Sequence, residues 1–174
     1  MGHTMYAYLT LLFNICLFKK GPQDIPQSSL LFRFSIIGFA IISYLLIQLS
    51  VDSFNALLQA SAELSIIISF TGLLLTITNK LNRFLQTASA LIGTDALISL
   101  FAMPVIATLS LDNSNILASL VMLALMIWSW LVTAHIVRHA INKPFSFAAG
   151  IVFLYLFSAF KIMGILFPPI SPAA

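Results

Sequence analysis

The sequence predicts an all-α membrane protein: a polytopic bundle of five transmembrane helices preceded by an N-terminal helix that lies along the membrane surface. Of its 174 residues, 60% are hydrophobic and only 7% are charged, whereas a soluble domain carries about 25% charged residues. Eight Lys or Arg and five Asp or Glu cannot cover the surface of a soluble protein of this size. The surface is therefore expected to face lipid.

Five apolar segments are long enough to span a bilayer, because about 20 helical residues cross the hydrocarbon core of roughly 30 Å. Polar connections separate them, and these are short, so successive helices should be antiparallel neighbours. The predicted spans are Leu30 to Ser50, Phe54 to Thr78, Leu85 to Leu109, Asn115 to Arg138 and Phe145 to Phe167. Residues 30–168 thus form the membrane domain, residues 1–29 an N-terminal helix and loop, and residues 169–174 a short tail.

The stretch from Met5 to Phe18 is apolar but too short to span, since about 14 residues make a helix of roughly 21 Å. We expect it to lie along the inner membrane surface; the alternative is a sixth span, which would move the N-terminus to the other side. Residues 1–4 resemble a cloning remnant and are left out of this reasoning.

Basic residues occur at every second connection, which predicts the orientation of the bundle. The two remaining connections carry only Asp52 and Asp112. The basic side chains are Lys19, Lys20 and Arg33 around the start of the first span, Lys80 and Arg83 after the second, and Arg138 and Lys143 after the fourth. By the positive-inside rule, the N-terminus is cytoplasmic and the C-terminus lies on the opposite side. Lys80, Arg83, Arg138, His139 and Lys143 should form a cytoplasmic basic surface that faces anionic headgroups.

Glu63, Asp95 and Lys161 lie deep in the predicted spans, and His135 lies in a span nearer the inner surface; charge is costly at such positions and often functional. Glu63 and Lys161 are each about 15 residues from the inner end of their helices, at a depth of roughly 22 Å. Equal depth makes them a candidate ion pair between the second and fifth spans. The alternative is that Lys161 extends toward the far interface and leaves Glu63 protonated.

Asp95 lies near the midplane and has no basic residue at its own depth. It is expected to be a neutral hydrogen-bond donor between helices, or else a proton- or ion-binding carboxyl. Ser89 and Gly93, four residues apart, form a step of small residues that permits close helix packing beside it.

The remaining candidates for metal or redox chemistry are weak. His135 and His139 are four residues apart and share a helix face, a spacing that can hold a metal or haem. They fit a basic surface cluster better, and no metal or other cofactor is expected. Cys16 is the only cysteine, which excludes an intramolecular disulfide. Trp128 and Trp130 are expected to pack inside the bundle, where the Trp128 N–H needs a partner.

Two segments resemble the Yip1 family of small membrane proteins. They are the start of the third span, Arg83-Phe84-Leu85-Gln86-Thr87-Ala88 with Pro104 late in the helix, and the fourth and fifth spans with Trp128-Ser129-Trp130-Leu131-Val132 and Phe147-Ala148-Ala149-Gly150. The resemblance begins near Leu30. The chain lacks the long polar N-terminal domain of eukaryotic members. The resemblance implies five helices, a cytoplasmic N-terminus and a non-enzymatic role in membrane organisation, trafficking or complex assembly.

Function is therefore predicted as a non-catalytic membrane scaffold or accessory protein, whose partners are the lipid bilayer and other membrane proteins or further copies of itself. Nucleic acid is not an expected partner. The alternative is a small transporter or channel that uses Glu63, Asp95 and Lys161, and a membrane redox subunit with His135 and His139 is a third reading. Short loops and the charge pattern favour a bacterial cytoplasmic membrane.

Overall fold

The computed structural model describes residues 2–112 and 114–168, and within them it contains five helices long and apolar enough to cross a membrane. The five predicted spans are confirmed, with each boundary within three residues of its expected place. The predicted tail over residues 169–174 lies outside the described residues. The spans are α2 (Ser29–Ile47), α3 (Ser53–Ile77), α4 (Phe84–Leu111), α5 (Ile116–Ile141) and α6 (Phe145–Leu166), with the 3-10 turn η2 (Leu81–Arg83) leading into α4.

Short polar caps begin the two helices that follow the acidic connections. The Asp52 carboxylate accepts hydrogen bonds from the backbone N–H of Asn55 at 3.2 Å and from its side chain at 2.6 Å. These bonds, the side-chain one first, hold the pKa of Asp52 below its usual range. Asn115 accepts from the backbone N–H of Ala118 at 3.0 Å and caps α5 in the same way. Both caps satisfy donors that a helix start leaves unpaired.

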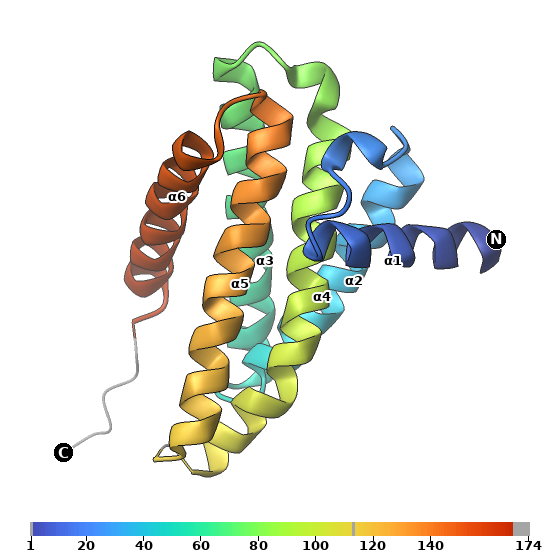
Figure 1. Ribbon diagram of the computed structural model, residues 1–174. Helices are drawn as coiled ribbons and strands as arrows, with labels where there is room; N and C mark the ends of the chain where they lie inside the picture. The colour runs from blue at the N-terminus through green and yellow to red at the C-terminus, as the bar shows by residue number, and fades with distance from the viewer. Residues whose placement is uncertain (1, 113, 169–174) are drawn as a thin grey trace.

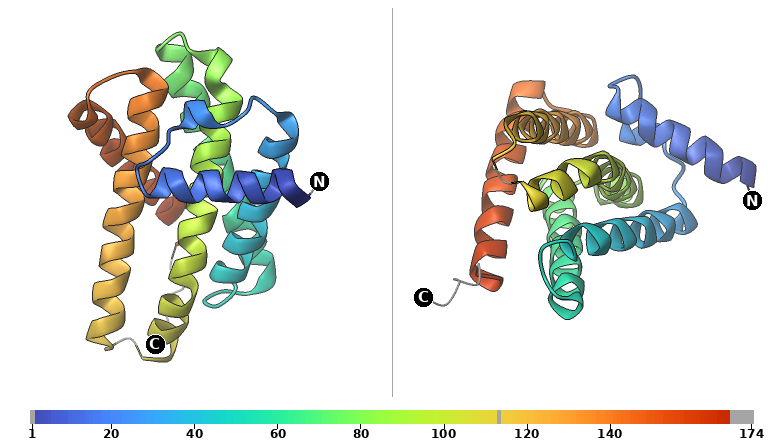
Figure 2. Two further views of the ribbon diagram at one scale, coloured as in Figure 1. Left: turned by 45° about the vertical axis from the view of Figure 1, so that its right-hand side comes forward. Right: turned by 90° about the horizontal axis from the view of Figure 1, so that it is seen from below.

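The N-terminal helix α1 (Gly2–Cys16) lies crosswise to the spans (Figure 1). It passes in front of α4, from α5 to α2 (Figure 2). Its 15 residues make a helix of roughly 22 Å, shorter than a span. A linker with one 3-10 turn, η1 (Pro22–Asp24), then leads to α2. The expectation of a surface helix is supported over that of a sixth span.

Two apolar clusters hold the bundle together. The larger joins α1 to the spans beneath it, through fully buried side chains such as Ile15, Phe39, Ile92 and Ile136. The smaller joins α3, α5 and α6 and is built mainly from small residues, with Ala134, Ala148 and Val152 at its centre. In lipid, apolar side chains gain little by exchanging lipid tails for one another. Helix association therefore depends on close packing, which small residues permit.

Thr87, in the first turn of α4, is a buried side chain whose hydroxyl has no hydrogen-bond partner among the described residues. Since an unpaired buried donor costs roughly 1–3 kcal/mol, Thr87→Val should stabilise the protein by about 1 kcal/mol. Thermal unfolding in detergent measures this. Thr71→Val is the matched control, because equally buried Thr71 donates to the Ile67 carbonyl at 2.7 Å. Destabilisation by Thr87→Val would mean that its hydroxyl is bonded.

Candidate functional site

The basic residues gather at one end of the bundle, and two of them cap α5. Lys80 Nζ donates to the Ile141 carbonyl at 2.7 Å, and the Arg83 guanidinium donates to the His139 carbonyl at 3.4 Å. Cations are favourable at this end of a helix, because its last carbonyls are unpaired and carry partial negative charge. Arg138 and Lys143 are exposed. Within the predicted basic surface, these two side chains are therefore more accessible to lipid headgroups than Lys80 and Arg83.

His135 does not belong to that surface, contrary to the sequence-based expectation, because only 8% of it is exposed. Its Nε2 lies 3.0 Å from the Lys20 carbonyl, and since a carbonyl only accepts, Nε2 carries the proton and donates. The rings of His135 and His139 are 4.6 Å apart, edge to face. Among the described residues no group of three His, Cys, Asp or Glu is placed to hold a metal ion.

The bond from His135 is one of several that attach the N-terminal strap, by which we mean residues 2–28, to the spans. Trp128 Nε1 donates to the Cys16 carbonyl at 3.0 Å, which supplies the partner that its N–H was expected to need. The Gln86 side chain donates to the Ile25 carbonyl at 2.7 Å. Helices α4 and α5 thus bind the strap through its backbone carbonyls.

A hydroxyl cluster attaches the first half of α1 to α2 and α4. The Tyr8 hydroxyl shares a 2.6 Å hydrogen bond with Ser35 Oγ and donates to the Ser89 carbonyl at 3.2 Å. Ser35 also lies within 3.0 Å of the Leu31 carbonyl, a further acceptor. Tyr8, Ser35 and Ser89 are all buried. Ser35 and Ser89 lie six and five residues after the first residues of α2 and α4, so α1 crosses roughly 8 Å along these helices.

Gly93 lets α1 approach α4 closely. A Cβ at this position would lie 2.8 Å from Leu12 Cδ1 and 3.2 Å from the Tyr8 hydroxyl. The small residues Ser89 and Gly93 were expected to permit close helix packing, and they do so. The helix that packs against them is α1, which lies crosswise to the spans.

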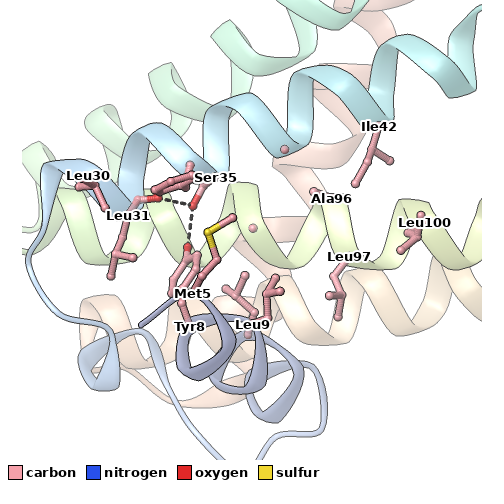
Figure 3. A pocket seen from close by; sticks show the side chains of 14 residues that line it. Met5, Tyr8, Leu9, Leu30, Leu31, Ser35, Ile42, Ala96, Leu97 and Leu100 are labelled. Atoms are coloured by element: carbon pink, nitrogen blue, oxygen red, sulfur yellow. Dashed lines mark hydrogen bonds between the residues drawn. The ribbon is translucent and has the colours of Figure 1, made fainter. Parts of the chain in front are cut away.

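Between α1, α2 and α4 lies an apolar groove of about 360 Å³ (Figure 3). The Tyr8–Ser35 hydrogen bond lies near one end, whereas Ile42 and Leu100 lie toward the other. Gly38 on α2 also lines it, and a Cβ there would meet nothing within 4 Å. The groove is thus a hydrocarbon-compatible space bounded by the strap.

Glu63 and Lys161 are not paired. Glu63 Oε2 accepts a hydrogen bond from Ser43 Oγ at 3.3 Å, across α3 and α2. Lys161 is exposed, and its ammonium lies 5.6 Å from the centre of the Phe157 ring on its own helix. The predicted ion pair is therefore wrong. The alternative, a lysine that extends toward the far interface, fits this position five residues before the end of α6.

Asp95 is half-buried in the middle of α4, close enough to Glu63 for their charges to interact. Among the described residues its carboxyl has no side-chain hydrogen bond to a neighbouring helix, so the predicted role as an interhelical donor finds no support. Asp95 and Glu63 thus lie within electrostatic range of each other without a hydrogen bond between them, whereas Lys161 lies elsewhere.

Sequence reasoning missed Tyr8, Ser35 and Ser43. The buried residues of α2 are Leu31, Ser35, Phe39 and Ser43, spaced every four residues. Serines that recur at this spacing in an apolar helix mark the face that packs against other helices. That signal was present for the two serines. No comparable pattern identifies Tyr8 as their partner.

Comparison with known proteins identifies no relative: no protein-family model, curated protein or solved structure matches the chain. The resemblance to the Yip1 family therefore stays a prediction. What the structure establishes, over the residues it describes, is the class: an all-helical protein with five helices long and apolar enough to cross a membrane.

Tyr8→Phe should weaken the attachment of α1, because it leaves the buried Ser35 hydroxyl and Ser89 carbonyl with fewer partners. We expect a loss of about 1 kcal/mol, or roughly 2–4 °C in the unfolding temperature, measured in lipid nanodiscs. Tyr6→Phe is the control, since Tyr6 lies on the same helix and is 73% exposed. Equal effects of the two substitutions would contradict a role for the hydroxyl cluster.

Proposed function

We propose that this protein is a non-catalytic integral membrane scaffold or accessory subunit that binds other membrane proteins or further copies of itself. The observation that carries the proposal is that residues 156–166 of α6 contain no buried residue. We call this segment the free half of α6. The Yip1-like segments favour the same class of function. The proposal involves neither a cofactor nor nucleic acid.

The buried residues of helix α6 all lie in its first half. They are Ala148, Ala149 and Val152, and Tyr155 stacks on Phe70 of α3 with ring centres 4.0 Å apart. No residue from there to Leu166 is buried in the described chain. Figure 1 places α6 at the edge of the bundle, where another helix has access to it.

The free half of α6 carries polar groups as well as apolar ones. Ser158 and Lys161 are exposed and three residues apart, so they share one helix face. Lys161 extends toward the far interface, but Ser158 lies within the span, where a polar side chain is costly and commonly bonds to a neighbouring helix or marks a functional surface. Large apolar side chains flank them, with Phe160 75% and Ile165 80% exposed. This combination favours a helix–helix contact.

A photocrosslinking residue at Phe160 should yield discrete protein adducts in native membranes, because it lies within the free half of α6. Leu117 at the start of α5 is the matched control, with an exposure of 73% against 75% for Phe160; a crosslinker there should capture mainly lipid. Electrophoresis and mass spectrometry of the adducts measure both. Lipid adducts alone at both positions would contradict the scaffold proposal.

A transporter or channel is the second candidate, favoured by the proximity of Asp95 and Glu63 on neighbouring helices. Lys161 has no place in this version of the site, since it lies on the exposed face of α6. Purified protein in liposomes distinguishes the two functions. A proton or cation flux that Asp95→Asn and Glu63→Gln both abolish would overturn the scaffold proposal and establish the transporter.

The basic end of the bundle is proposed to face the cytoplasm of a bacterial cell, with the N-terminus on that side and the C-terminus opposite. The charge asymmetry of the connections supports this orientation. Cysteine labelling can test it with little background, because Cys16 is the only cysteine and is buried. Burial raises the pKa of the Cys16 thiol to about 12, so almost none of the reactive thiolate forms at neutral pH.

In intact cells, a membrane-impermeant maleimide should label Ser114→Cys between α4 and α5 and should not label Asn82→Cys between α3 and α4. Both positions are exposed. Asn82→Cys should become reactive once the inner membrane is opened, and the unsubstituted protein should stay unlabelled throughout. The reverse pattern for the two positions would contradict the proposed orientation.

A further inference from the structure

We propose that the groove under α1 binds one acyl chain of a bilayer phospholipid whose phosphate lies beside Arg33. This site is separate from the free half of α6 and does not depend on the scaffold function. The groove has a volume of about 360 Å³, within the range of roughly 300–1,000 Å³ that ligand sites occupy. Its walls are almost entirely apolar, with Leu9, Leu12, Phe34, Ile42, Leu97 and Leu100 among them.

The polar groups of the groove leave no free donor for a polar ligand. The two hydroxyl protons, those of Tyr8 and Ser35, have acceptors within the protein: each other's oxygens and the carbonyls of Leu31 and Ser89. A polar solute would lose its water without gaining hydrogen bonds, at a cost of several kcal/mol. A hydrocarbon chain has no such cost. The chemistry of the walls therefore selects an alkyl chain.

The direction of the groove also fits an acyl chain. Its lining residues on α2 run from Leu30 to Ile42, which is roughly 18 Å along the helix. A single leaflet of hydrocarbon is roughly 15 Å thick, half of the bilayer core. The groove begins at Leu30, in the first turn of α2. From there it runs along α2 and α4 (Figure 3), as the chains of a lipid in that leaflet run along the spans.

Arg33 supplies the charge complementarity for the headgroup. It does not line the groove itself, but it is exposed and lies three residues after Leu30, a groove residue that is 49% exposed, so the two side chains are neighbours on the surface of α2. It is four residues into α2, at the depth where a headgroup meets the hydrocarbon. A guanidinium binds phosphate oxygens in a bidentate manner. The acidic residue of the neighbouring linker, Asp24, accepts a hydrogen bond from the Gly21 backbone N–H at 2.8 Å. Its carboxylate is thus engaged within the linker and leaves Arg33 to the headgroup.

Gly38→Leu tests the proposal, because its side chain would enter the groove without meeting protein at the Cβ position. Gly150→Leu is the matched control: its Cβ also meets nothing within 4 Å, and it lies on α6, away from the groove and outside the free half of that helix. The measurement is native mass spectrometry of the protein released from nanodiscs of phosphatidylglycerol and phosphatidylcholine. The unsubstituted protein and Gly150→Leu should retain one phospholipid, and Gly38→Leu should retain at least tenfold less.

An exposed arginine favours anionic phosphatidylglycerol over zwitterionic phosphatidylcholine, so Arg33→Gln should keep the bound lipid but lose that preference. A phosphatidylglycerol with a diazirine in its acyl chain gives a readout without any substitution, and it should crosslink to α1, to α2 near Gly38 and to α4 near Leu97. Equal lipid retention by Gly38→Leu and Gly150→Leu would overturn the proposal. Adducts spread evenly over all spans would also overturn it. A loss of self-association in Gly38→Leu without a loss of lipid would overturn it too, and would assign the groove to a second copy of the protein.

Discussion

Inside a bilayer a polar group has no water to bond with, and each unsatisfied group costs several kcal/mol. Helices satisfy their own backbones under this constraint, but side chains need partners from elsewhere in the chain. In this protein the N-terminal strap meets much of that need. Trp128 and His135 donate to its carbonyls, and Tyr8 bonds to Ser35 and Ser89. Hydrogen bonding thus explains why a short crosswise helix is an integral part of the bundle.

The two sides of the bundle differ as a result. Toward α2 the strap encloses an apolar groove, and close contact at Gly93 fixes its height on α4. Toward α6 no such element adds to the packing, and small residues near one end make most of the contact. The proposed lipid site and the proposed partner surface therefore lie on opposite faces for one reason, the position of α1.

The sequence predicted the number, length and ends of the spans, because span length follows from bilayer thickness and loop polarity is local. It also predicted equal depths for Glu63 and Lys161 and, from them, an ion pair that the structure does not form. Depth depends on residue count alone, whereas contact also depends on direction around the helix. At about 100° per residue, Lys161 falls on the opposite side of α6 from Ala148 and Val152. Those small buried residues were the signal for the packed face.

The attachment of the strap could not be predicted, because the acceptors are carbonyls, which every residue has. It also has a consequence for biosynthesis. The partners of Tyr8, Cys16 and Lys20 lie up to 81, 112 and 115 residues later in the chain. A ribosome releases the strap long before α4 and α5 exist, so its first helix must wait at the membrane surface. Docking therefore cannot be complete before α5 has been made, and a chain that stops short of α5 would expose an unanchored apolar segment to the quality-control proteases of the cell.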